Sequence, residues 1–308
     1  MKFESIYGNQ PIKKMLLNSI CTHNLLHSYL FLGPDGIGKS CFAKEFAKMI
    51  LCMNTTDATN CTSCKSCLEF DSQNHPDFMI VAPDDGKSIK IEQIRYLQEK
   101  ISEKPIISEH KVYIIDDCGS MTKEAQNCLL KTLEEPPEYA ILILILSNES
   151  KLLNTIKSRC TKIVFHKLNT QEMKDFFASQ GNESFLSDSI LKMSDGSIGK
   201  ALLLQKDLSF YQEVDTILSS FETKDIADIW NDSDILYKSK DSIGHLLEYM
   251  NVILMDRLLK TQELKYVNAI EVIEATKNRL DSNANFDMSI DTLLLQLWEE
   301  LNEKHHRS

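Results

Sequence analysis

Eight residues near the start of the chain, GPDGIGKS at 33–40, have the spacing of a phosphate-binding loop, G-x-x-x-x-G-K-[ST]. An apolar run precedes them and a helical pattern follows, which is the context that this motif requires. Glycines let backbone N–H groups surround phosphate oxygens, and a helix N-terminus adds partial positive charge. The alternative is a glycine-rich turn followed by a chance Lys-Ser pair. We predict a site for ATP or ADP with Mg²⁺, formed by Gly33, Gly36, Gly38, Lys39 at the outer phosphates and Ser40 as a metal ligand.

Two carboxylates end a second apolar run, VYIIDD at 112–117. In a buried parallel strand, such an acidic end meets a metal–phosphate site. We expect Asp116 to hold the Mg²⁺ shell, while Asp117 stands where many ATPases carry a glutamate that polarises water. Aspartate is shorter by one C–C bond, about 1.5 Å, and a misplacement near 1 Å can lower a rate roughly a hundredfold. The sequence therefore predicts nucleotide binding with poor hydrolysis, although Asp117 fits equally well as a solvated cap of the helix expected from residue 122.

Polar residues also follow the next apolar run along the chain. Ser147 and Asn148 stand at its end, where they can face the γ-phosphate of a bound nucleotide. A Ser-Asn pair at a strand end is often only a turn, so this pattern indicates a contact less specifically than the phosphate loop does.

Four cysteines lie close together in a polar segment, with the spacing C-x8-C-x2-C-x2-C. Four thiolates can close a tetrahedral Zn²⁺ site without an open position, which favours a structural metal over a catalytic one. The alternative is a cluster of free surface thiols. The other five cysteines are scattered and are expected to be small core residues. The predicted zinc ligands are Cys52, Cys61, Cys64 and Cys67, and the predicted core cysteines are Cys21, Cys41, Cys118, Cys128 and Cys160.

The elements that must position these groups alternate between apolar runs and helical spacing. Strands are expected at 28–33, 77–83, 111–116, 140–147 and 161–168, and helices at 39–52, 89–102 and 122–137. This alternation predicts an open parallel α/β sheet. After about residue 168 only helical patterns continue. The expected division is an α/β domain at 1–168 with the cysteine insertion at 52–67, a short helical domain at 169–207 and a helical bundle at 208–308.

The composition excludes several classes of protein. Apolar residues make up 43% of the chain and charged residues 26%, which is typical of a soluble globular protein. With a formal net charge of -11, the chain is not expected to bind nucleic acid over its whole surface, so any DNA contact would be local or made by a partner. The apolar run YAILILIL is too short to span a bilayer, and no membrane contact is expected. No signal peptide is visible, and nine cysteines, an odd number, fit reduced thiols in a cytoplasm.

Several short segments together carry a family resemblance. They are the phosphate loop with its four-cysteine insertion, HPDF, SIKIEQIR, KVYIIDD, EAQNCLLKTLEEPP and SRC. Together they closely resemble the bacterial replicative clamp loader and, within it, the delta-prime subunits of DNA polymerase III. The resemblance is strong over 1–168, fair through about 205 and limited to helical character beyond. It implies an AAA+ protein with a RecA-like nucleotide-binding domain, a helical lid at 169–207 and a helical collar at 208–308.

The resemblance also implies partners and site residues. It implies ATP-driven opening of a sliding clamp and its loading on primed DNA, within a hetero-pentamer that contains tau/gamma and delta subunits. Arg159 in IKSRC matches the family's arginine finger, which projects into a neighbouring subunit's ATP site, whereas composition alone would make it a surface ion-pairing arginine. The segment IYGNQ resembles one that packs against adenine. Motor subunits carry an arginine in the lid where this chain has Gly199, and helical phase turns Lys200 about 100° away.

Four interpretations stay open at this stage. The first is a stator-like clamp-loader subunit that holds nucleotide, hydrolyses it poorly and lends Arg159 to its neighbour. The second is a self-sufficient ATPase motor of the same complex, with Asp117 as the base. The third is a small-molecule kinase, which would need an arginine-rich lid, and residues 169–205 contain no arginine. The fourth is a zinc scaffold with a vestigial phosphate loop. We favour the first, because Asp117 and Gly199 both weaken hydrolysis.

Overall fold

The computed structural model describes Phe3 and residues 6–54, 61–84, 88–181, 188–206, 208–232, 234–240, 243–282 and 284–302. The chain divides into two compact units, Met1–Gly181 with Gly196–Gly199, and Asn182–Asp195 with Lys200–Ser308. The three-part division expected from the sequence, with boundaries near 168 and 207, stays a prediction.

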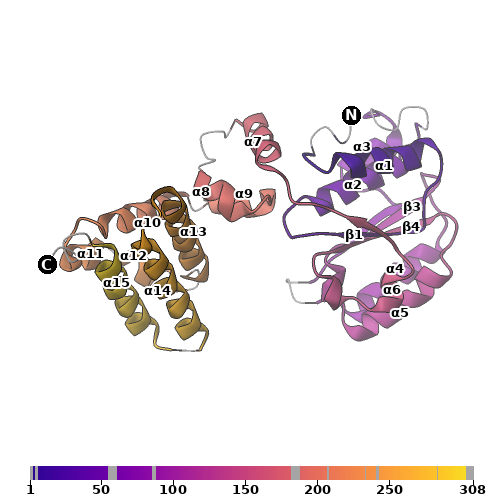
Figure 1. Cartoon of the computed structure of the whole chain (residues 1–308). Helices are drawn as coiled ribbons and strands as arrows, with labels where there is room; N and C mark the ends of the chain where they lie inside the picture. The colour runs from indigo at the N-terminus through magenta and orange to yellow at the C-terminus, as the bar shows by residue number, and fades with distance from the viewer. Residues whose placement is uncertain are drawn as a thin grey trace. The chain divides into compact units, whose positions relative to one another are not determined.

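A parallel sheet forms the centre of the first unit (Figure 1). Its strand order is β2-β3-β4-β1-β5, and every neighbouring pair is parallel. The predicted α/β class is thereby confirmed, with β5 shorter than expected. The strands are β1 (Ser28–Leu32), β2 (Phe78–Val81), β3 (Lys111–Ile115), β4 (Ala140–Leu146) and β5 (Thr161–Val164).

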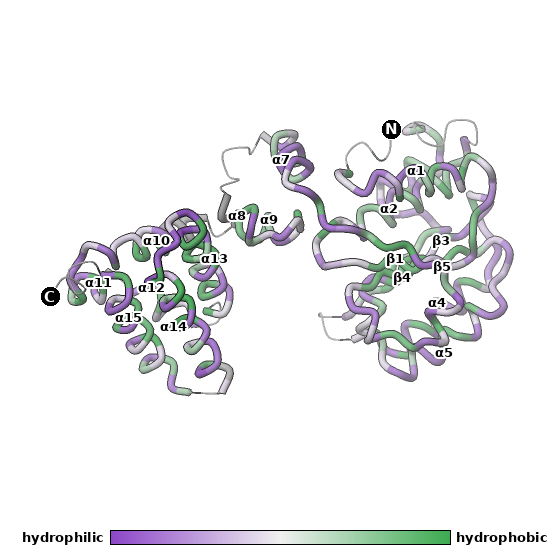
Figure 2. The backbone as a smooth tube through the Cα atoms, in the orientation of Figure 1, coloured by the Kyte–Doolittle hydropathy of each residue, from purple (hydrophilic) through white to green (hydrophobic). Residues whose placement is uncertain are grey.

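Burial explains why the central strands are almost continuously apolar. Every residue of β3 and β4 is buried, because helices cover both faces of a parallel sheet. The edge strand β5 instead leaves Val164 exposed and buries Ile163. Figure 2 shows hydrophobic residues on the central strands β1 and β4.

Helices lie on both faces of the sheet (Figure 1). On the face of α1, α2 and α3, the rings of Phe31, Phe42, Phe46 and Phe165 belong to one aromatic core, and Phe42 and Phe165 stack edge-on at 5.0 Å. Apolar side chains of α4 and α5 fill the other face. The helices of this unit are α1 (Gln10–Cys21), α2 (Lys39–Ile50), α3 (Lys65–Asp71), α4 (Ile91–Ser102), α5 (Lys123–Glu134), α6 (Asn154–Lys157) and α7 (Thr170–Ser179), with short 3-10 turns η1 (Cys118–Ser120) and η2 (Glu149–Lys151).

The second unit is helical throughout the part that the structure describes, which agrees with the disappearance of strand patterns after residue 168. Its longest helices pack in sequence, α13 on α14 and α14 on α15. Residues such as Met250, Ile273 and Leu293 are fully buried between them. The helices are α8 (Asp188–Ser194), α9 (Ile198–Lys206), α10 (Leu208–Ser220), α11 (Ile226–Asp232), α12 (Asp234–Lys238), α13 (Ile243–Thr261), α14 (Leu264–Asp281) and α15 (Phe286–Leu301). Among the described helices, none has the length and apolar run that crossing a bilayer needs.

Candidate functional site

The predicted phosphate loop connects the carboxyl end of β1 to the first turn of α2. The Gly33 N–H donates to the Leu146 carbonyl at 3.2 Å, which fixes the start of the loop against β4. Gly36 and Gly38 have φ values of 73° and 93°, in the left-handed region that glycine adopts without strain. The backbone therefore curves at these two positions as a phosphate-binding loop requires, and α2 begins directly behind it.

Lys39 lies inside this loop rather than in solvent. Only 6% of its side chain is exposed, and its Nζ donates 2.6 Å hydrogen bonds to the carbonyls of Gly33 and Pro34. Burial lowers the pKa of Lys39, while the carboxylates of Asp35, Asp116 and Asp117 act in the opposite direction. The ammonium is thus held inside the loop, 3.9 Å from the Asp35 carboxylate.

The structure brings Ser40 and Asp116 together. The Ser40 hydroxyl donates a 2.8 Å hydrogen bond to Asp116 Oδ2, across the gap between α2 and the end of β3. Two oxygen atoms this close together could both be ligands of one Mg²⁺ ion, whose remaining ligands would come from phosphates and water. Ser40 and Asp116 would therefore hold the ion, which when bound would neutralise phosphate charge.

Asp117 does not cap the following helix, so that alternative is wrong. The N-cap of α5 is Thr122, whose hydroxyl accepts from the Ala125 N–H at 3.2 Å. Asp117 is exposed and has a φ of 51°, a conformation that aspartate adopts more readily than most residues. Its negative charge acts on Lys39, whose pKa it tends to raise against the larger effect of burial. Its role as a base stays a prediction.

Asn148 has a local structural role beside the site. It follows β4, the strand that contacts the start of the phosphate loop, and its Oδ1 accepts from the backbone N–H and the hydroxyl of Ser150. The side-chain oxygen thus caps the turn η2. Any contact with a γ-phosphate would have to use the amide nitrogen.

The turn at Gly196–Gly199 packs directly on the phosphate loop. The Gly199 N–H donates to the Gly36 carbonyl at 2.8 Å, and the Ser197 hydroxyl donates to the Asp35 carbonyl at 2.9 Å. A Cβ added at Gly199 would lie 2.8 Å from the Cα of Gly36. No larger residue, an arginine included, fits at position 199 unless this contact opens.

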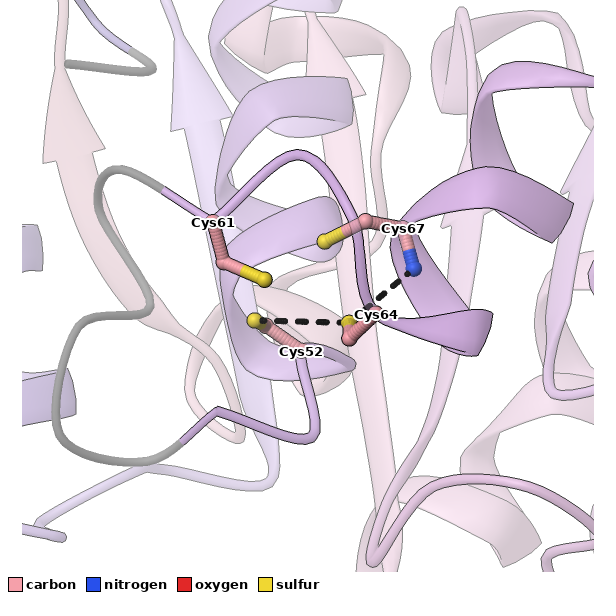
Figure 3. A group of neighbouring side chains, drawn as sticks. All are labelled: Cys52, Cys61, Cys64 and Cys67. Carbon is pink, nitrogen blue, oxygen red and sulfur yellow. Dashed lines mark hydrogen bonds between the residues drawn. The ribbon is translucent and has the colours of Figure 1, made fainter.

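The four predicted zinc ligands meet in space (Figure 3). The Sγ atoms of Cys52, Cys61, Cys64 and Cys67 all lie within 4.8 Å of one another, and those of Cys52 and Cys64 are 3.9 Å apart. Zn–S bonds of about 2.3 Å in a tetrahedron place sulfur atoms about 3.8 Å apart. The thiols therefore fit a Zn²⁺ ion with no open position.

Hydrogen bonds from the local backbone favour the thiolate form of Cys64 in this cluster. Burial tends to raise the pKa of Cys64, but hydrogen bonds from the Cys67 and Met53 N–H groups and from neighbouring thiols lower it to about 6. The thiolate is the form that binds metal.

Of the five cysteines expected in the core, Cys118 is buried, whereas Cys21 and Cys41 are exposed. The expectation is wrong for those two, because they lie on the solvent side of α1 and α2.

Arg159 lies at the edge of the sheet opposite the phosphate loop. The Ser28 hydroxyl, at the start of β1, donates to the Arg159 carbonyl at 2.8 Å, whereas the phosphate loop follows Leu32 at the end of β1. Four residue steps along a strand span about 13 Å. The guanidinium Nη2 lies 2.7 Å from Glu134 Oε1, and Nη1 donates to the Thr155 carbonyl at 2.8 Å.

Comparison with known proteins agrees with this arrangement. A family model described as DNA polymerase III, delta subunit, matches residues 8–169. The delta-prime subunit of DNA polymerase III from Bacillus subtilis is 31% identical over 321 residues, which cover 94% of this chain and 96% of that one. The chain belongs to the delta-prime family of DNA polymerase III subunits. The resemblance found in the short sequence segments is thereby confirmed.

Members of a related subunit class also match. The tau subunit of DNA polymerase III from Bacillus subtilis is 33% identical over 221 residues, which cover 69% of this chain but 39% of that one. A solved structure of a gamma subunit-related protein from Thermotoga maritima is 15% identical, covers 92% of this chain and 99% of that one, and has a TM-score of 0.44.

One residue of the delta-prime sequence that the motifs did not single out links α5 to the segment bearing Arg159. Gln126 is buried, and its amide donates to the carbonyls of Met121 and Lys151. Its Oε1 accepts from the Leu153 N–H at 2.9 Å. A polar residue on the mostly apolar buried side of an amphipathic helix was the sequence signal for this role.

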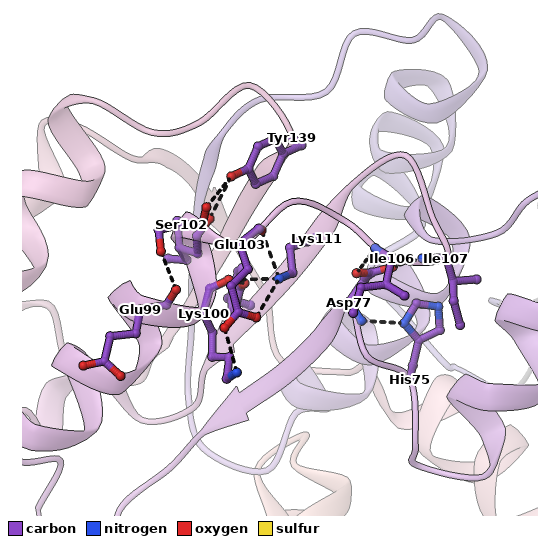
Figure 4. A network of polar contacts seen from close by, with 12 residues as sticks. His75, Asp77, Glu99, Lys100, Ser102, Glu103, Ile106, Ile107, Lys111 and Tyr139 are labelled. Carbon is purple, nitrogen blue, oxygen red and sulfur yellow. Dashed lines mark hydrogen bonds and ion pairs between the residues drawn. The ribbon is translucent and has the colours of Figure 1, made fainter.

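A second group of residues that the sequence analysis missed lies between the cysteine insertion and the sheet, and Figure 4 shows its members His75 and Asp77 beside Ile106 and Ile107. Asp77 is fully buried and accepts backbone hydrogen bonds from Ile106, Ile107 and Ser108 at 2.7–2.9 Å. His75 Nε2 lies 2.9 Å from the Ser66 hydroxyl, and Ser66 stands beside Cys67, one of the four clustered cysteines. These contacts hold α3, and with it one side of the thiol cluster, against the loop before β3.

Proposed function

We propose that this chain is a clamp-loader subunit that completes the ATP site of a neighbouring subunit. In this proposal it holds ATP or ADP with Mg²⁺ at its own phosphate loop, hydrolyses nucleotide poorly by itself, and supplies Arg159 in trans. It acts in a hetero-pentamer with tau/gamma and delta subunits that loads a sliding clamp onto primed DNA. Membership of the delta-prime family supports the assignment to this complex.

The observation that carries the proposal is the position of Arg159. Its backbone is bonded to Ser28 at the start of β1, about 13 Å along the strand from the phosphate loop. The guanidinium is bonded at this end of the sheet to Glu134 and to the Thr155 carbonyl, and its side chain is partly exposed, so a neighbouring subunit could reach it. A guanidinium that reaches a neighbour's phosphates can stabilise transition-state charge, an effect of about 10³ to 10⁵ in other finger systems.

Two further features support weak hydrolysis by the chain alone. Asp117 is one C–C bond shorter than the glutamate that many ATPases use, and Gly199 occupies the lid position of the motor subunits' arginine while contacting Gly36. Without a full-length base and a lid cation, the developing charge is only partly stabilised.

The decisive experiment measures ATP turnover by the complex reassembled from this chain, its partner subunits, the clamp and primed DNA. Arg159→Ala should leave nucleotide binding to this chain intact and lower the ATP turnover of the complex at least tenfold. Arg95→Ala is the matched control, since it removes an exposed arginine from α4. Unchanged turnover with Arg159→Ala would rule the finger out.

A second candidate function is a self-sufficient ATPase motor of the same complex. The intact phosphate loop and the Ser40–Asp116 hydrogen bond favour it, as does the identity shared with a tau subunit. Fast ATP turnover by the isolated chain, abolished by Asp117→Asn, would select this function over the first.

A further inference from the structure

Glu134 and Arg159 come together from two different elements at the same edge of the sheet. Glu134 is the last residue of α5, a helix that begins beyond Asp117 at the carboxyl end of β3 and returns to the edge where β4 begins. Arg159 precedes β5 at this edge. Their side chains are 49% and 35% exposed, so the pair lies at the surface, where another subunit can reach it.

The contacts fix the guanidinium at both of its terminal nitrogens. Nη2 is 2.7 Å from Glu134 Oε1, while Nη1 donates to the Thr155 carbonyl at 2.8 Å. A planar guanidinium held at two points keeps one orientation, whereas an exposed arginine without partners samples many rotamers. Because a guanidinium has five N–H groups, others stay available to phosphate oxygens while these two are engaged.

We infer that Glu134 is a positioning residue for the arginine finger, which it orders before a neighbour's nucleotide binds. This inference rests on the proposed function of Arg159. Glu134 acts through Arg159, by holding the guanidinium in one orientation and leaving its remaining N–H groups unengaged. Pre-ordering matters for turnover because small misplacements of a catalytic group lower rates steeply.

The expected effect is modest because an exposed ion pair is weak. Pairs of this kind change equilibria by about two- to fivefold. Glu134→Gln should therefore lower the kcat of the reassembled complex by about two- to fivefold, with little change in KM and in nucleotide binding by this chain. Salt screens exposed charges, so the difference from the unsubstituted complex should shrink as ionic strength rises.

The matched control is the neighbouring residue. Glu135→Gln removes the same charge from another exposed position one residue away, and it should leave kcat unchanged. The thermal unfolding midpoint of each variant chain shows whether the fold is intact. In a double-mutant cycle, Glu134→Gln added to Arg159→Ala should have no further effect, because the group that Glu134 orders is then gone.

The outcomes separate the inference from the function on which it rests. Suppose that Arg159→Ala lowers turnover while Glu134→Gln behaves like Glu135→Gln or raises kcat. In that case Glu134 does not position Arg159, although the role of Arg159 as the arginine finger is still supported. A loss of the same size in the Arg159→Ala background would also overturn the inference, since Glu134 would then act elsewhere. If Arg159→Ala has no effect, both proposals fall together.

Discussion

The Ser40 hydroxyl donates a 2.8 Å hydrogen bond to the Asp116 carboxylate, although 76 residues separate the two along the chain. The parallel sheet makes this contact, because the elements after β1 and β3 emerge at the same edge. Arg159 and Glu134 meet at the other edge. In the proposed function, the two ends of the sheet therefore serve two different ATP sites, and substitutions at one end should leave the function of the other end intact.

Removing the loop ammonium should weaken nucleotide binding. Lys39→Met deletes a buried charge that would bond the outer phosphates, and a hydrogen bond to a charged group contributes about 1.5–3 kcal/mol, or roughly ten- to a hundredfold in affinity. Titration of the isolated chain with ATP and ADP gives the dissociation constants. Lys44→Met, on the exposed side of the same helix, should bind as tightly as the unsubstituted chain. Equal affinity in both variants would support a vestigial loop.

Lengthening the side chain at position 117 should increase ATP turnover by the isolated chain. Asp117→Glu moves the carboxylate outward by about 1.5 Å, and we expect a gain of about tenfold, below the hundredfold limit for such shifts because Gly199 still lacks an arginine. Asp117→Asn, which has no basic carboxylate, should show no gain. If the two variants hydrolyse ATP equally slowly, the length of residue 117 does not limit the reaction.

The cysteine cluster should bind one zinc ion per chain. Metal analysis of the purified protein counts the ion, and cobalt(II) in its place should give the absorption of a tetrahedral thiolate site. Cys64→Ser should release the metal and lower the thermal midpoint by several degrees, because metal binding energy contributes to folding. Cys21→Ser, at an exposed thiol outside the cluster, should change neither. Full zinc occupancy in Cys64→Ser would remove that residue from the ligand set.

Stability of the first unit should fall in mild acid because of His75. Burial lowers the pKa of His75, outweighing the carboxylates of Asp77 and Glu69, which act in the opposite direction. Its folded pKa then lies below the unfolded value of about 6.5. The unfolded state binds the extra proton, so the stabilisation is present above about pH 6.5 and is lost as the pH falls below that value toward the folded pKa.

The matching measurement is urea unfolding between pH 8 and pH 5.5, followed by circular dichroism. The loss attributable to one histidine is at most about 1.4 kcal/mol per pH unit. His75→Gln should unfold more easily at pH 8 but lose less stability on acidification, whereas the exposed His245→Gln should follow the unsubstituted chain. Trp230 and Trp298 both lie in the second unit, so their fluorescence reports that unit separately. Parallel pH profiles for the two variants would contradict the role of His75.

Local patterns predicted the elements well and individual side-chain roles less well. The apolar run at β4 was recognisable because a strand buried on both faces excludes polar residues along its whole length. The cap of α5 was not, because Asp117 and Thr122 both precede the helix and both residue types can accept a backbone N–H. The backbone decides between them, and only Thr122 is placed to bond Ala125.

The sequence by itself determined the phosphate loop, the acidic strand end and the cysteine spacing, because each lies within one short segment whose chemistry depends on neighbouring residues. Tertiary structure alone decided which distant groups meet. The sequence around Arg159 does not predict its contact with Glu134, and the sequence around Gly36 does not predict its contact with Gly199. The physical reason is that the connections of a parallel sheet lie at two opposite ends, where the strands begin and where they finish. Which connections are neighbours at one end depends on the order of the strands, and the order of the strands is set by packing of the whole unit.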